Sequence, residues 1–139
     1  MFRRILVPLD LSGRNERTLK TALELARQHR ARVSLLHVIH HVPNVPAPEL
    51  HDFYQRLGQV AARRLERVAK RFVSKGVRVG WVVCIGEPAR EIVGVSAKQK
   101  ADLIVMGSHK VAPGRPAVGW GTTSYKVGIF CRCPILLVK

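Results

Sequence analysis

The chain has few acidic residues, few cysteines and no long hydrophobic run. Nine Asp and Glu stand against 24 Lys and Arg, a formal net charge of +15 over 139 residues. A charge of this size favours anionic partners and carries no information about the fold. The three cysteines cannot build an even-numbered disulfide framework, which is typical of a reducing compartment.

No apolar run reaches the length that spans a bilayer. Near the start of the chain, Pro8 and Asp10 interrupt the apolar residues too early for a signal peptide. The sequence therefore predicts a cytoplasmic protein without a membrane partner.

Short apolar runs alternate with helical patterns along the chain. Strands are expected over residues 5–9, 33–38, 77–85, 103–106 and 135–138. Helices are expected from Ser12 or Asn15 to about residue 29, and over 49–75, 88–100 and 122–130. Apolar runs without polar alternation indicate strands that are covered on both faces. The pattern predicts one α/β domain over residues 1–139, a doubly wound parallel sheet with helices on both faces.

Small and polar residues follow two of these strands. Asp10 comes directly after the first strand, and Gly107 and Ser108 follow the fourth. Ligands of parallel sheets bind beyond the carboxyl ends of the strands. A glycine-bearing loop then leads to hydroxyl residues at 122–124, a helix start whose N–H groups can hold an anion. The alternatives are an Asp10 that only stabilises a helix N-terminus and a plain loop before a capped helix.

Five segments resemble one known family in their order and spacing. They are Ile5 to Asp10, Leu36-His37-Val38, Gly86-Glu87-Pro88, Asp102 to His109 and Cys133 to Val138. Together they resemble the universal stress protein family over essentially the whole chain. The resemblance implies a five-stranded sheet of order 3-2-1-4-5, a role in the stress response and, in one branch of the family, binding of ATP.

The resemblance also implies which residues would hold an adenine nucleotide, with Mg²⁺ accompanying ATP. Asp10 would contact the adenosine, and Pro8, Leu9 and Val38 would surround the adenine. The other candidates come from the fourth strand and the loop after it: Met106, Gly107, His109, Lys110, Gly121, Thr122, Thr123 and Ser124. No constellation of catalytic side chains emerges, so we expect binding and at most slow hydrolysis of bound ATP.

The phosphate loop departs from the family pattern G-x2-G-x9-G-[S/T]. The first glycine matches at Gly107 and the final pair matches at Gly121-Thr122. The second glycine is replaced by Lys110, and the loop is one residue longer than the pattern. The loop is therefore degenerate, and a nucleotide-free interaction protein of the same family is an alternative.

Three further features have a functional and a structural interpretation. The histidines and acidic residues of segment 40–52, and the Cys131-x-Cys133 pair, lack the spacing of a metal site. Edge strand 135–138 is apolar and needs cover, which predicts a homodimer through these strands. A basic stripe on the second helix is either a solvated face or a surface for polyanions or nucleic acid: Arg56, Arg63, Arg67 and Lys70.

Overall fold

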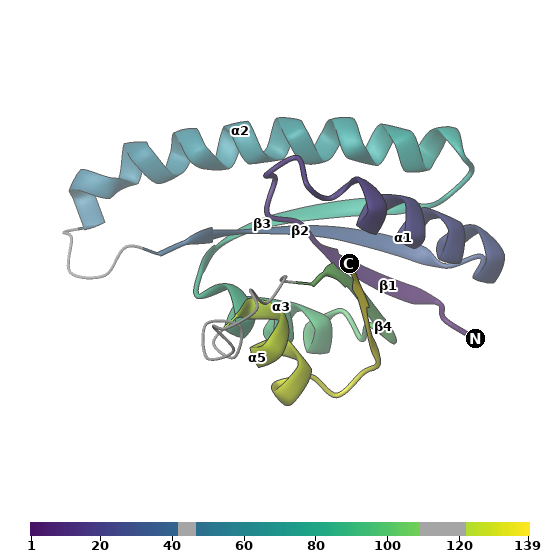
Figure 1. Cartoon of the computed structure of the whole chain (residues 1–139). Coiled ribbons are helices and arrows are strands. Elements are labelled where there is room, and N and C mark those ends of the chain that lie inside the picture. The colour runs from purple at the N-terminus through teal and green to yellow at the C-terminus, as the bar shows by residue number, and fades with distance from the viewer. Residues whose placement is uncertain (42–46, 109–121) are drawn as a thin grey trace.

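Strands and helices alternate along the chain, as the sequence predicts (Figure 1). The structure is a computed structural model that describes residues 1–41, 47–108 and 122–139. Its elements are β1 (Arg4–Pro8), α1 (Glu16–His29), β2 (Arg32–His40), α2 (Ala47–Ser74), β3 (Val79–Gly86), α3 (Pro88–Lys98), β4 (Leu103–Gly107), α5 (Thr123–Phe130) and β5 (Ile135–Val138). Within this part of the chain, no helix is both long and apolar enough to cross a membrane.

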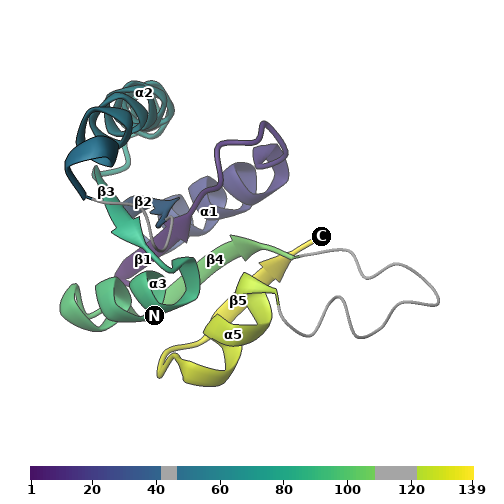
Figure 2. The ribbon, with the colours of Figure 1, turned by 90° about the vertical axis from the view of Figure 1, so that its left-hand side faces the viewer.

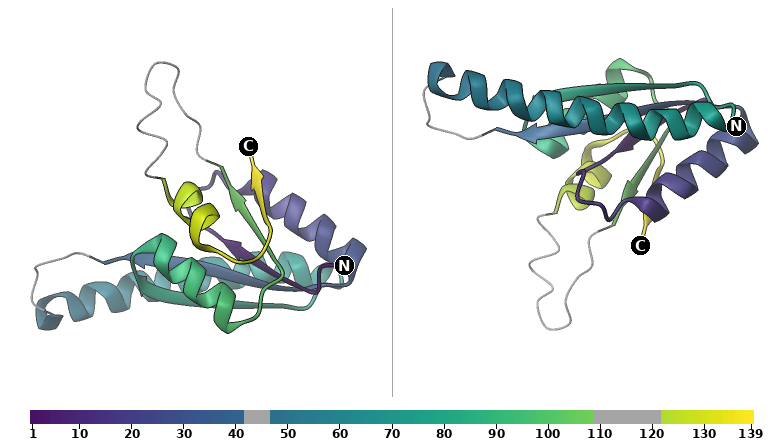
Figure 3. Two further views of the ribbon diagram at one scale, coloured as in Figure 1. Left: turned by 90° about the horizontal axis from the view of Figure 1, so that it is seen from below. Right: turned by 90° about the horizontal axis from the view of Figure 1, so that it is seen from above.

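The strands form one sheet in the order β3-β2-β1-β4-β5, and every neighbouring pair is parallel. The predicted fold class and strand order are confirmed. Helices α1 and α2 cover one face of the sheet, and α3 and α5 cover the other (Figures 2 and 3). All carboxyl ends of the strands consequently meet at one edge of the sheet, which we call the carboxyl edge.

Side chains alternate between two hydrophobic clusters, one on each face of the sheet. On β1, Ile5 and Val7 belong to the cluster under α1 and α2, whereas Leu6 belongs to the cluster under α3 and α5. The same alternation on β4 places Val105 on the first side and Met106 on the second. Burial on both faces explains why these strands are continuous apolar runs.

Several expected boundaries were wrong by one or two residues. Strand β2 extends to His40 instead of residue 38, because its ladder with β3 continues through the pair His40–Gly86. Strand β3 begins at Val79 instead of residue 77, because Gly76, with φ +81°, and the buried Val77 form the turn after α2. Helix α3 ends at Lys98, two residues early, and Lys100 adopts a left-handed conformation.

The start of α1 differs from the expectation in its chemistry. Asn15 is the N-cap residue, but its side chain makes no capping hydrogen bond. Its amide instead donates to Asp10 Oδ1 at 2.9 Å. Helix α3, in contrast, is capped by the Glu87 carboxylate, which accepts from the backbone N–H groups of Ala89 and Arg90. The pKa of Glu87 lies below its ordinary value, and the largest cause is the hydrogen bond from the Arg90 N–H. Burial acts in the opposite direction and raises this pKa.

Candidate functional site

A cleft of about 1440 Å³ opens at the carboxyl edge of the sheet. Its walls come from the ends of β1, β2, β4 and β5, from the start of α1 and α5, and from the face of α2. The predicted site residues that line it are Pro8, Leu9, Asp10, Val38, Met106, Gly107, Thr122, Thr123 and Ser124. The predicted residues His109, Lys110 and Gly121 lie outside the described residues.

Asp10 is held by the loop between β1 and α1. Its Oδ1 accepts from the Ser12 backbone N–H and from the Asn15 side-chain amide, both at 2.9 Å. Burial raises the pKa of Asp10, but these hydrogen bonds and the charge of Arg14 outweigh it, so the pKa lies below its ordinary value. Asp10 is therefore a fixed carboxylate at neutral pH, and it orders the loop instead of capping α1.

Two side chains that the sequence did not single out hold the backbone on either side of Asp10. His37 Nδ1 donates to the Leu9 carbonyl at 2.8 Å, and Arg64 Nη1 donates to the Leu11 carbonyl at the same distance. Leu11 has a positive φ of 60°. Both side chains also line the cleft, so Asp10 is braced from β2 on one side and from α2 on the other.

The middle of the cleft is apolar. Met106 is buried in the cluster under α3 and α5, together with Leu36, and Val38 packs against the same cluster. Pro8 is buried beside them at the end of β1. This part of the lining offers an apolar surface to a ligand, and Asp10 follows Pro8 by two residues in the same lining.

Hydroxyl groups gather at the other end of the cleft. Thr122 caps α5, because its Oγ1 accepts from the Tyr125 N–H, and it lies 3.3 Å from Ser124 Oγ. Ser108 follows β4 and accepts a hydrogen bond from Lys139 Nζ at 3.0 Å. The first turn of α5 lines the same space with Thr123 and Ser124, and a helix N-terminus favours negative charge.

The charges along the cleft have one dominant sign. Among its described residues Asp10 is the only acidic side chain, whereas the Lys and Arg side chains are Arg14, Arg17, Arg64 and Lys139. The cleft therefore suits an anion with an apolar ring.

In the described part of the chain, no group of three or more His, Cys, Asp and Glu is placed to hold a metal ion. Cys131 donates to the Cys133 carbonyl, and burial raises the pKa of the Cys133 thiol, with Cys131 adding to the shift.

The comparison that decides the family is a model described as the universal stress protein family, which matches residues 1–139. The chain belongs to the universal stress protein family. A universal stress protein of Thermus aquaticus is 34% identical over 147 residues, and the match covers 100% of both chains. The predicted family is thus confirmed.

Solved universal stress protein folds resemble the structure over its full length. Protein MJ0577 of Methanocaldococcus jannaschii is 28% identical, with a TM-score of 0.86 over 100% of this chain and 96% of that one. A universal stress protein of Archaeoglobus fulgidus, solved in complex with dAMP, is 20% identical, with a TM-score of 0.70 over 99% and 98% of the two chains. At that identity the second likeness concerns the fold alone.

Proposed function

We propose that this universal stress protein binds an adenine nucleotide, ATP above all, in the cleft at the carboxyl edge. The adenine packs on Val38 and Met106, the ribose hydroxyls donate to Asp10, and the phosphates lie over Gly107 and residues 121–124. The observation that carries the proposal is the lining of the cleft. Every described candidate residue lines this one cleft, which has an apolar centre and a rim of cationic side chains. The dAMP complex of the related fold from Archaeoglobus fulgidus supports the same ligand class.

The proposed action is binding in the cytoplasm as part of the stress response, not catalysis. The cleft lining supplies an anion site and a base site, and Mg²⁺ would enter with the phosphates of ATP. The alternative within the family is an interaction protein that works without nucleotide, or a binder of polyanions. Its supporting observation is the basic stripe of α2, whose four members are all exposed: Arg56, Arg63, Arg67 and Lys70.

The proposed assembly is a homodimer through the edge strand β5. Leu136 and Leu137 are 38% and 42% exposed on this strand. On the neighbouring α5, Ile129 and Phe130 are also exposed. An apolar strand edge flanked by an apolar helix surface is a liability unless it is covered, and a second copy of the chain would cover it.

Titration calorimetry of Mg-ATP and of adenosine tests the nucleotide site. We expect a micromolar dissociation constant for ATP, about −8 kcal/mol. Asp10→Asn keeps the side-chain shape but removes the charge that accepts the ribose hydroxyls. It should weaken both ligands about tenfold, since a hydrogen bond to a charged group contributes roughly 1.5–3 kcal/mol.

The matched control is Glu24→Gln, an equal change of charge at an exposed position of α1 outside the cleft. It should leave both affinities unchanged. Absence of any heat at millimolar ATP and adenosine would contradict the proposed function and favour the nucleotide-free alternative.

A further inference from the structure

We infer that Lys139, presented together with Ser108, binds the terminal phosphates of the nucleotide and makes the cleft prefer ATP and ADP over AMP. The inference rests on the proposed function, because it assigns a residue to one end of the same ligand. Lys139 belongs to no part of the family's loop pattern. It lies 29 positions beyond Lys110, which occupies the place of the second glycine of that pattern.

The sheet itself brings Lys139 to the cleft. Strands β4 and β5 pair up to Gly107 and Val138, and the Ser108 N–H then donates to the Val138 carbonyl at 2.8 Å. The ladder thus continues one residue past the strand ends, so that Ser108 and Lys139 become lateral neighbours. The hydrogen bond of 3.0 Å from Lys139 Nζ to Ser108 Oγ is the direct result.

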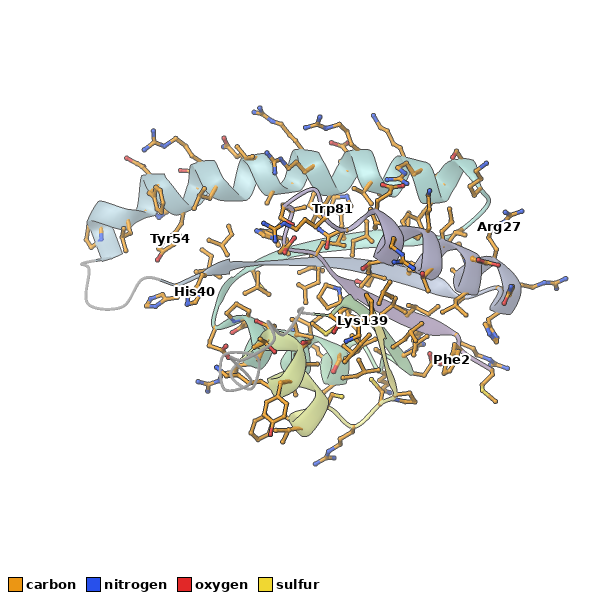
Figure 4. All side chains as sticks on the ribbon, viewed as in Figure 1. Phe2, Arg27, His40, Tyr54, Trp81 and Lys139 are labelled. Carbon is orange, nitrogen blue, oxygen red and sulfur yellow. The ribbon has the colours of Figure 1, made fainter. Side chains whose placement is uncertain are left out.

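Both side chains lie on the face of the sheet that carries α5. Met106 belongs to the cluster under α3 and α5, and Ile135 packs against it. Ser108 and Lys139 follow them by two and four residues, and side chains at even spacing along a strand share a face. Both residues line the cleft together with the hydroxyls of Thr122 and Ser124 (Figure 4 labels Lys139).

The ammonium group of Lys139 keeps donors for a ligand. Its bond to Ser108 uses one of the three donors of the ammonium group, and its partner is a neutral hydroxyl. The one salt bridge between side chains of the described residues joins Arg71 and Glu16, away from Lys139. A lysine of this kind binds phosphate as a point charge.

The position of Lys139 in the sheet determines which phosphate groups of the nucleotide it can reach. Asp10 follows β1, and β5 lies two strands from β1 in the sheet order. At the usual strand spacing of about 4.8 Å, the end of β5 is displaced sideways by roughly 10 Å from the end of β1, where Asp10 contacts the ribose. A nucleotide whose ribose contacts Asp10 reaches this distance with its β- and γ-phosphates rather than with its α-phosphate.

Dissociation constants for adenosine, AMP, ADP and ATP test the inference on the full chain. For Lys139→Gln we expect ATP to bind about tenfold more weakly, the loss of one charged hydrogen bond. Adenosine and AMP should change by less than about twofold, and Lys139→Arg should restore most of the ATP affinity. Lys98→Gln, the same substitution at an exposed position at the end of α3, is the matched control.

The outcomes separate the inference from the proposed function. If wild-type protein binds adenosine and ATP but Lys139→Gln binds ATP normally, the inference is wrong and the nucleotide site stands. An equal loss for adenosine and ATP would also overturn it, because a terminal-phosphate contact cannot affect adenosine. If the wild-type protein binds none of the four ligands, both proposals fail. Equal thermal midpoints of the variants show that these exposed substitutions leave the fold intact.

Discussion

Arg30 adopts a backbone conformation at the end of α1 that glycine adopts more easily than arginine. Its φ and ψ are 55° and 40°, and its N–H closes the helix on the carbonyls of Ala26 and Arg27. The sequence did not single it out, because only a glycine would have indicated a left-handed cap. The end of α2 lies within one residue of the expected position 75, and Gly76 occupies the equivalent left-handed conformation there with φ +81°.

Arg30→Gly should therefore stabilise the protein. An L residue in the left-handed conformation costs roughly 1–2 kcal/mol of stability, which glycine avoids. Glycine in turn lowers the stability by about 0.5–1 kcal/mol, because it gives the unfolded chain more conformational freedom. We expect a net increase of about 0.5 kcal/mol in the free energy of unfolding, measured by urea denaturation. Arg27→Gly, inside the same helix, should lower it by about 1 kcal/mol. Equal destabilisation by both variants would contradict this account of the cap.

Single residues of the site also show what a sequence can reveal. Asp10 was predictable, because it follows directly after an apolar strand, and strand ends bind ligands in parallel sheets. Arg64 and Lys139 were not. Arg64 contacts a carbonyl 53 positions away and Lys139 a hydroxyl 31 positions away, so both contacts exist only once the chain is folded.

Among the elements, the apolar strands could be recognised most directly from the sequence, whereas the sequence did not show which residues of α2 are buried. Apolar runs such as Leu103–Gly107 are unambiguous, because both faces of a parallel sheet must be apolar. The stripe expected on α2 is buried at Ala61, Leu65 and Phe72, but Leu57 is 38% exposed. The reason is geometric, since the N-terminal end of this long helix projects beyond the sheet (Figure 1), and periodicity alone cannot say how far a partner surface extends.

Strand β5 carries a prediction about assembly. Light scattering at tens of micromolar should give the mass of a homodimer, since paired edges would cover Leu136 and Leu137. The double substitution Leu136→Asp and Leu137→Asp should give a monomer, because it would place like charges beside the two-fold axis on each face of the paired sheets. The control is Val73→Asp on α2, where the side chain is 63% exposed, and it should leave the dimer intact. A monomeric wild-type protein would refute the assembly.

At the scale of the whole molecule, the position of the cleft could be predicted from the sequence, but its cationic rim could not. The strand order and the switch between β1 and β4 predict a site at the carboxyl edge. Its cationic rim depends on α1, α2 and β5, which the fold brings together from distant segments (Figure 3). The described lining of the cleft accounts for only a small part of the formal net charge of +15, and the rest is spread over the chain. Helix α2 contributes exposed Lys and Arg side chains to it (Figure 4).

That excess predicts weak, non-specific binding to duplex DNA without a built site. The affinity should fall steeply with salt and vanish near physiological ionic strength, since each phosphate contact contributes about 0.9 to the logarithmic salt slope. Replacing Arg63 and Arg67 by alanine should change the slope no more than replacing Arg27 and Arg30 on α1 does, because charge alone is at work. If only the α2 pair flattens the slope, by about two, while ATP binding stays intact, then α2 is a true polyanion surface. Fluorescence anisotropy over a salt series distinguishes non-specific binding from a polyanion surface on α2. We expect equal salt slopes for the two double variants, because neither helix carries a nucleic-acid recognition motif in this sequence.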